Sequence, residues 1–193
     1  MSYYPWSKTL SFIQKLSPMI ASTVNPPANL ETIQILEESV NLILPEPFCD
    51  YLLTFEGQNE AGELHPLLGS NRFLPVAEII RVWQDQKNLG DFLSSEYLGR
   101  ENKIRTDYQW NPRWLPFASL DGQMLLMDFD PGKNGTYGQV FQYWPGMDFL
   151  ADDFVMANSF ADFGSELLHR FESDDYHYHI KDQLISFDDD WLI

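Results

Sequence analysis

The sequence contains a single cysteine, little positive charge and no long apolar run. Because Cys49 has no second cysteine to pair with, a disulfide within the chain is excluded. The helical pattern around Cys49 indicates a small buried side chain, and no motif places a histidine beside the thiol to activate it as a nucleophile. No apolar stretch is long enough to span a bilayer, and the first residues lack the basic segment and apolar core of a signal peptide. We therefore expect a cytoplasmic protein.

Positive charge is scarce throughout the chain. Lys and Arg number 12 against 29 Asp and Glu, which gives the 193 residues a formal net charge of −17. This balance disfavours nucleic acid and anionic membranes, because both are bound by neutralising phosphate charge. It permits fast encounter with a basic protein partner, although an excess of one charge also serves solubility alone. We expect no nucleic-acid or membrane partner.

Recognisable catalytic arrangements are missing as well. The sequence has no Ser-His-Asp elbow, no Cys–His pair and no metalloprotease helix. The glycines of residues 132–135 lack the spacing and the following helix of a phosphate-binding loop. His177 and His179 would face one side of a strand, as in some zinc sites, but no third ligand follows at a recognisable spacing. We expect no catalytic residue, no metal and no cofactor.

One pair of carboxylates has two interpretations. Asp128 and Asp130 lie two residues apart, so on a strand they would share a face and could act as paired carboxylates or metal ligands. Pro131 and Asn134-Gly135 follow at once, however, and are ordinary turn residues in which a carboxylate accepts backbone N–H bonds. The turn interpretation is favoured, and the metal site stays open as the alternative.

The stretch 114–144 predicts three strands. Asp121-Gly122 between two apolar runs indicates a tight hairpin, because both residues accept positive φ. Residues 124–129 are apolar except for Asp128, which is typical of a buried strand. Pro131 should end that strand, since proline cannot donate to the ladder. A glycine-rich loop then leads into a third strand over 139–144.

Helical periodicity surrounds this stretch. We expect a first helix from Trp6 to Ile20, ended or kinked by Pro18. Further helices should run from Pro26 to Val40 with Asn25 as the cap, from Leu44-Pro45 to a C-cap at Gly57, and over 75–93. Short strands are expected near 64–68 and within 149–157. A last helix should follow the capping box formed by Ser159 and Asp162.

This order of elements favours an α+β fold. A mainly antiparallel sheet in the second half should pack against helices from the first half and against a closing C-terminal helix. No linker composition interrupts the chain, so we expect one domain over residues 1–172 and an acidic tail over 173–193. The tail ends in Asp188-Asp189-Asp190 and Trp191-Leu192-Ile193, which could stay solvated, dock on the domain or bind a partner.

The ordered motifs resemble the SUKH superfamily of the Smi/Knr type over roughly residues 6–171. The residues that carry the resemblance are Trp6, Leu44, Pro45, Gly57, Trp114, Pro116, Phe117, Ala118, Asp121, Gly122, Asp128, Asp130, Pro131, Gly138, Gln139, Val140, Ser159 and Phe160. We expect them to be structural. One departure is that Gln123-Met124 follow Asp121-Gly122 directly, where the family often carries further Gly and Asp.

The resemblance implies a binding module and not an enzyme. Bacterial members commonly neutralise cognate toxins by direct binding, whereas fungal members act as scaffolds in cell-wall glucan synthesis and signalling. The compact length favours the immunity role, with a basic toxin domain as partner. A rival of another class is a metal-dependent hydrolase that uses Asp128, Asp130 and the tail histidines.

Partner binding should use an acidic surface studded with aromatic residues. The expected partner-binding residues are Tyr137, Tyr143, Trp144, Asp152, Asp153, Trp110 and Glu46. Tyr143 and Trp144 have an alternative role in the core, because aromatic side chains dominate cores as well as interfaces.

Overall fold

The computed structural model describes residues 5–69, 71–90, 103–105, 110–120, 122–144 and 154–187. Its helices are α1 (Pro5–Leu16), α2 (Pro18–Ser22), α3 (Leu30–Val40), α4 (Glu46–Thr54), a 3-10 helix η1 (Glu60–Glu63), α5 (Val76–Gly90) and α6 (Phe160–Glu172). Its strands are β1 (Arg72–Phe73), β2 (Trp114–Leu120), β3 (Gln123–Asp128), β4 (Gln139–Tyr143), β5 (Val155–Ala157), β6 (His177–His179) and β7 (Leu184–Ser186).

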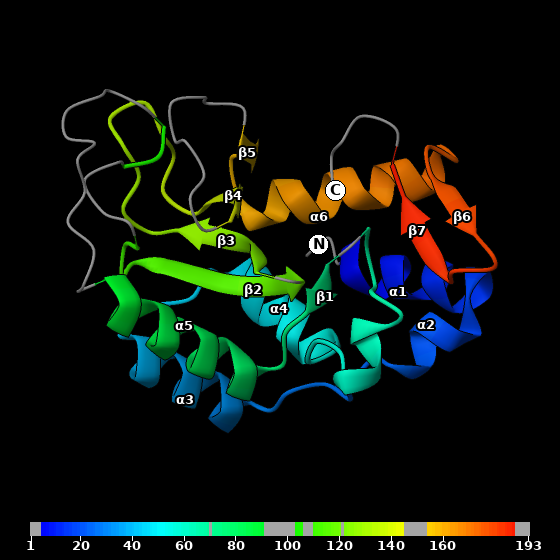
Figure 1. Ribbon diagram of the computed structural model, residues 1–193, viewed down its shortest axis with the longest axis horizontal. Coiled ribbons are helices and arrows are strands. Elements are labelled where there is room, and N and C mark those ends of the chain that lie inside the picture. The colour runs from blue at the N-terminus through cyan, green and yellow to red at the C-terminus, as the bar shows by residue number, and fades with distance from the viewer. Residues whose placement is uncertain are drawn as a thin grey trace.

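Strands β1 to β5 form one sheet in sequence order, and every neighbouring pair is antiparallel. In Figure 1, β2 and β3 cross the middle of the molecule, α5 and α3 lie below them, and α6 extends from the β4–β5 end towards α1. This arrangement confirms the α+β fold, with the sheet in the second half of the chain and a helix closing it.

The hairpin between β2 and β3 has the expected register. Leu120 pairs with Gln123, so two residues connect the strands, and Gly122 has a φ of 87°. The connecting Asp121 lies outside the described residues. Further along β2 the register shifts between Pro116 and Ala118, where the proline cannot donate to the ladder. The predicted β2–β3 hairpin is confirmed by this pairing. A local turn signal in the sequence was sufficient to predict it.

The core is built from aromatic side chains of distant segments. Trp6 of α1 lies against Tyr51 of α4, with ring centroids 5.0 Å apart. Phe117 of β2 meets Phe160 and Phe163 of α6 at centroid distances of 5.2 and 5.7 Å. All five rings are almost completely buried. The sheet, the first-half helices and the closing helix therefore share one aromatic centre.

A second aromatic group fills the core at the other side of β2. Trp114 is fully buried, and its ring lies 5.2 Å from Phe141 and 5.9 Å from Tyr143. Trp110, which precedes β2, contacts both Trp114 and Tyr143 at centroid distances of 5.7 and 5.6 Å. These rings come from the sheet and from the segment leading into it.

The start of the second expected helix differs from the prediction. Helix α3 begins at Leu30, and its cap is Asn29, whose side chain accepts a hydrogen bond from the Thr32 amide at 2.8 Å. Asn25 instead donates its side-chain amide to the Glu56 carbonyl at 2.9 Å. The helix starts late because residues 26–28 cross the end of α4, where the Ala28 amide donates to the Leu52 carbonyl.

The expected role of Gly57 as a helix C-cap is also wrong. Helix α4 has its C-cap at Phe55, and Gly57 lies beyond it with a φ of 62°. A Cβ built on Gly57 would lie 2.5 Å from the backbone of Leu74. Glycine is needed here because two backbone segments meet too closely for any side chain.

The strand expected near residues 64–68 is absent from that segment. Strand β1 lies just beyond, at Arg72–Phe73. The Gln58 side chain takes the hydrogen bonds that a strand partner would supply, because it accepts from the Leu67 amide and donates to the His65 carbonyl, each at 2.9 Å.

Four other expectations are confirmed: the break at Pro18, the helix over 76–90, the strand over 155–157 and the Ser159 cap of α6.

Residues 177–186 form the β6–β7 hairpin within the expected tail. Ile185 of β7 is fully buried, and its carbonyl accepts a hydrogen bond from the Gly69 amide at 2.7 Å. Ser17, the cap of α2, donates its hydroxyl to the Gln183 side chain at 2.6 Å. The buried Phe187 contacts Phe171 of α6. The hairpin therefore lies against the helical side of the domain, and residues 188–193 are outside the described part.

Candidate protein-binding site

The carboxylate of Asp128 belongs to a buried hydrogen-bond network. Its Oδ1 accepts from the Asp130 amide at 3.0 Å, and its Oδ2 accepts from Gln139 Nε2 at 2.9 Å. Burial raises the pKa of Asp128 to about 6, which these hydrogen bonds only partly offset. The turn interpretation of this residue fits the contacts, because the carboxylate shapes the backbone that follows β3.

Asp130 points to a different set of partners. Its carboxylate accepts from Arg105 at 2.9 and 3.1 Å and from Asn111 Nδ2 at 3.0 Å. Gln139 at the start of β4 also contacts the segment around Lys103, since its Nε2 donates to the Lys103 carbonyl at 2.9 Å. Asp128 and Asp130 therefore hold segments of the chain together, each through its own partners.

Two glycines, Gly135 and Gly138, shape this loop. Gly138 has a φ of 82°, which a residue with a side chain rarely adopts, and its amide donates to the Asp128 carbonyl at 2.7 Å. A Cβ on Gly135 would lie 2.1 Å from the Lys103 carbonyl oxygen. Gly135 lets the β3–β4 loop lie directly against the segment around Lys103, and Gly138 lets the loop turn back to β3, which fits a strand-connecting loop.

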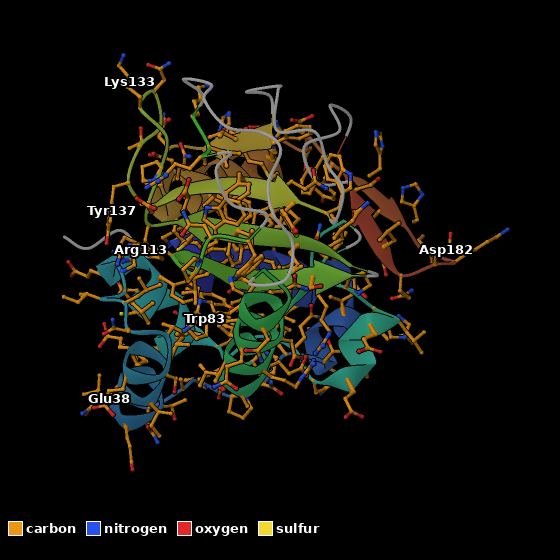
Figure 2. The ribbon with its side chains drawn as sticks, turned by 60° about the vertical axis from the view of Figure 1, so that its left-hand side comes forward. Glu38, Trp83, Arg113, Lys133, Tyr137 and Asp182 are labelled. Carbon is orange, nitrogen blue, oxygen red and sulfur yellow. The ribbon has the colours of Figure 1, made fainter. Side chains whose placement is uncertain are left out.

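The β3–β4 loop presents one exposed aromatic ring. Tyr137 is 58% exposed, and its ring meets that of Phe129 in an edge-to-face contact with centroids 5.4 Å apart. Figure 2 shows Tyr137 and Lys133 on the outer side of this loop. Tyr137 is therefore accessible to a partner, and its role in partner binding stays a prediction.

The other expected aromatic anchors differ in their exposure. Trp144 is half-buried and meets Phe154 edge to face at 5.0 Å. Tyr143 and Trp110 are 6% and 4% exposed and contact each other in the core. We assign no partner contact to Tyr143 and Trp110, because both rings pack against the buried Trp114 and are enclosed by the core. Asp152 and Asp153 lie outside the described residues.

Glu46 lies exposed in the first turn of α4, next to a group of carboxylates. One of these, Glu37 of α3, accepts a hydrogen bond from the Leu44 amide at 2.8 Å, which brings the end of α3 to the start of α4. Burial and the nearby carboxylates of Glu37, Asp50 and Glu46 raise the pKa of the neighbouring thiol to about 11. That thiol, Cys49, is therefore protonated at neutral pH and a poor nucleophile.

The residues that surround Glu46 were not expected from the sequence. Glu37 and Asp50 line the same corner, and Ile43 between the helices is 83% exposed. One sequence signal could have identified this region, because no Lys or Arg occurs between Lys15 and Arg72. An uninterrupted acidic stretch of that length is a stronger indication than the position of any single glutamate.

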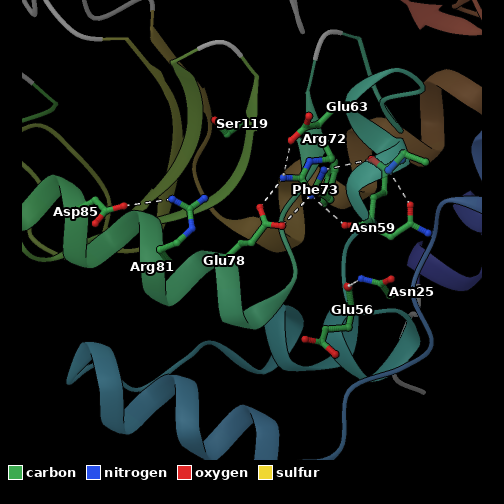
Figure 3. Close-up of polar contacts among 12 residues, drawn as sticks. Asn25, Glu56, Asn59, Glu63, Arg72, Phe73, Glu78, Arg81, Asp85 and Ser119 are labelled. Carbon is green, nitrogen blue, oxygen red and sulfur yellow. Dashed lines mark hydrogen bonds and ion pairs between the residues drawn. The ribbon is translucent and has the colours of Figure 1, made fainter.

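Arg72, the first basic residue after this stretch, is buried and makes its contacts within the domain. Arg72 is 5% exposed and pairs with Glu78 and Glu63, while Gln58 accepts from its guanidinium through the backbone carbonyl at 3.2 Å. Figure 3 shows Arg72 between the two glutamates, with the Arg81–Asp85 pair separate on α5. Arg72 therefore fixes β1 to α5, and among the carboxylates between Lys15 and Arg72 it pairs with Glu63.

The described residues contain no group of three or more His, Cys, Asp and Glu side chains placed to hold a metal ion. His177 and His179 are exposed on β6 with ring centroids 6.5 Å apart, and His179 shares a hydrogen bond with Ser186. In the same described segments, no helix combines the length and the apolar composition that crossing a membrane requires.

Comparison with known proteins gives two findings. The model of the SMI1 / KNR4 family (SUKH-1) matches residues 27–166, which include α3 to α5, the five-stranded sheet and the start of α6. A protein described as "KNR4/SMI1 homolog" from Yarrowia lipolytica (strain CLIB 122 / E 150) is 33% identical over 90 residues. That match covers 46% of this chain and 12% of the relative, so the two share only a small part of the relative's length.

Proposed function

Because the chain belongs to the SMI1 / KNR4 family (SUKH-1), we propose that it is a non-enzymatic protein-binding module, and specifically an immunity protein. In this role it binds a cognate toxin domain of basic charge and blocks the toxin's action. The observation that carries the proposal is the net charge of −17 on a chain of this family. A field of that sign accelerates encounter with a basic partner.

The polar groups that could serve chemistry have structural contacts, which supports a binding role. Asp128 and Asp130 are engaged by Gln139 and Arg105, and the Cys49 thiol is kept protonated. Tyr137 and Trp144 keep accessible ring surface next to the sheet. Rings of this kind anchor interfaces because they bury a large area at a small entropic cost.

A second candidate function is a scaffold or regulator of cell-wall glucan synthesis and signalling. The match to a KNR4/SMI1 homolog of Yarrowia lipolytica favours it. Both roles depend on protein binding, so the identity of the partner separates them. The third alternative, a metal-dependent hydrolase, would require a metal near Asp128, Asp130 or the two histidines of β6.

The test of the immunity role is co-expression with the product of the neighbouring gene. We expect that product to be toxic alone, to be tolerated with this chain, and to bind it directly when both are purified. Binding should weaken with added salt, because exposed charges are screened beyond about 10 Å at 0.1 M. Failure of the purified proteins to bind would contradict the immunity role.

The enzyme alternative has its own measurement. Protein purified without a His-tag should contain far less than one zinc or iron per chain by elemental analysis, and divalent cations should leave its melting temperature unchanged. One equivalent of metal that disappears in a His177→Ala/His179→Ala variant would favour the hydrolase.

A further inference from the structure

Exposed apolar side chains gather in one part of the chain. Of the eight large hydrophobic side chains that are exposed among the described residues, six lie between residues 19 and 64. They are Met19, Leu30, Ile35, Ile43, Leu53 and Leu64. Single exposed hydrophobic residues are normal, so an exposed apolar side chain matters here only where other features of an interface lie beside it.

The same segment is free of basic side chains. Between Lys15 and Arg72 the sequence has eight carboxylates and no Lys or Arg. They are Glu31, Glu37, Glu38, Glu46, Asp50, Glu56, Glu60 and Glu63. Exposed apolar side chains and carboxylates therefore occur in the same segment of the sequence, which supplies no cation of its own.

The two features meet where α3 passes into α4. We define the α3–α4 corner as Glu37, Glu38, Ile43, Glu46 and Asp50. The hydrogen bond from the Leu44 amide fixes Glu37 beside the connecting segment that bears Ile43. Glu46 and Asp50 are one turn apart on α4, so they lie on one face of that helix. The corner is thus an exposed isoleucine with carboxylates on both sides.

We propose that the α3–α4 corner is the docking surface for the basic partner protein, with Ile43 entering an apolar pocket and the carboxylates pairing with Lys and Arg around it. The inference rests on the proposed function and assigns a surface to it. An apolar centre within a charged rim is the usual anatomy of a protein interface. The centre supplies the anchor, and the rim supplies the rate and the orientation of encounter.

Charge complementarity selects a basic protein over other occupants. A second copy of the chain would bring two acidic corners together, and the tail residues 188–190 are aspartates of the same sign. Nucleic acid and anionic lipid are repelled for the same reason. A basic polypeptide has the opposite charge and can also supply the apolar pocket.

Variants in the corner and in the β3–β4 loop can be tested against each other. Figure 2 shows Glu38 at one end of the molecule and Lys133 of the loop at the other, with Asp182 on the β6–β7 hairpin to one side. Asp182 is exposed, as Glu46 is, and provides a matched site for charge reversal outside both surfaces.

The experiment measures association and dissociation rates of the purified neighbouring-gene product with the wild-type chain and with four variants. The variants are Ile43→Asp, Glu46→Lys, Asp182→Lys and Tyr137→Ala. Ile43→Asp should weaken affinity at least about 30-fold, which is the loss expected for a central anchor. Glu46→Lys should slow association several-fold and reduce its salt dependence, whereas Asp182→Lys should leave both within about twofold. Amide hydrogen exchange in the complex should slow over residues 30–54.

Three results would overturn the inference. Full affinity in Ile43→Asp and Glu46→Lys, with binding lost in Tyr137→Ala, would place the interface on the β3–β4 loop and leave the proposed function intact. A wild-type dimer that Ile43→Asp dissociates would show that a second copy covers the corner. Absence of any binding by the wild-type chain would remove the proposed function itself. Circular dichroism of each variant checks that the fold is unchanged.

Discussion

Trp6 of α1 stacks on Phe160 of α6, with ring centroids 5.2 Å apart and planes inclined by 23°. The indole also lies over Gly164, where an added Cβ would stand 3.2 Å from the ring. This contact joins the first helix to the closing helix of the domain. Phe12 and Phe171 stack further along the same two helices, with ring centroids 5.9 Å apart, so two aromatic pairs close this side of the core.

The Trp6→Ala variant tests that closure. Truncation should reduce the free energy of unfolding by about 3–5 kcal/mol, because the neighbouring rings cannot collapse fully into the space left behind. Urea denaturation measures the change. Leu30→Ala, at a side chain that is 74% exposed, should change stability by less than about 0.5 kcal/mol. Equal losses in the two variants would contradict the account of the core.

The two ion pairs in Figure 3 should differ in their contribution. Glu78→Gln should cost about 2 kcal/mol or more, because the longer contact to Glu63 is then the one ion pair described for the buried Arg72, beside its hydrogen bond to the Gln58 carbonyl. The matched change Asp85→Asn breaks an exposed pair and should cost less than about 0.5 kcal/mol. Chemical denaturation at low and high salt measures both values, and a cost that salt abolishes for Glu78→Gln would argue against a buried pair.

Asp128 should make stability fall as the pH rises. Its pKa in the folded protein, about 6, lies above its ordinary value near 4, so the folded state holds the proton more tightly than the unfolded state. The stabilising contribution is complete below pH 4 and is lost as the pH rises through 6. A shift of this size corresponds to about 3 kcal/mol.

The Asp128→Asn variant isolates this titration from those of other carboxylates. Its stability relative to the wild type should improve by up to about 3 kcal/mol between pH 4 and pH 7, although asparagine loses one acceptor for Gln139. Thermal unfolding across that pH range provides the measurement. A relative loss of stability on raising the pH would mean that the native site favours the ionised carboxylate.

Cys49 should be unreactive in the folded protein. Its pKa near 11 reduces the thiolate fraction at pH 8 by about a hundredfold relative to an ordinary thiol. Modification by iodoacetamide should therefore be at least about a hundredfold slower in the native chain than in urea. The native rate should keep rising up to about pH 11, and a plateau near pH 9 would exclude the raised pKa.

Local signals in the sequence were sufficient for several elements. Pro18 ends α1 because proline lacks the donor that the helix requires, and Ser159 caps α6 through the Asp162 amide at 3.1 Å. The turn at Gly122 connects β2 to β3 because glycine accepts a positive φ. The α+β order and the antiparallel sheet follow from such short-range patterns, which act over a few residues and need no knowledge of distant contacts.

The positions of turns and caps within loops were less predictable. Asn25 and Asn29 are equally good caps by type, and the choice of Asn29 depends on how residues 26–28 cross α4. Gly57 is glycine because Leu74 approaches it from a distant segment. Both choices are made by contacts between residues far apart in the sequence, so no local pattern contains them.

By itself, the sequence determined the acidic character of the protein, the family motifs and the succession of helices and strands. Only the tertiary structure decided which aromatic rings are enclosed, as Tyr143 is, and which remain accessible, as Tyr137 is. It likewise brought Glu37 and Glu46 near the same thiol, Cys49, and left Ile43 exposed in the segment that connects their helices. Burial is a property of what surrounds a side chain, and those surroundings come from segments that the sequence places far apart.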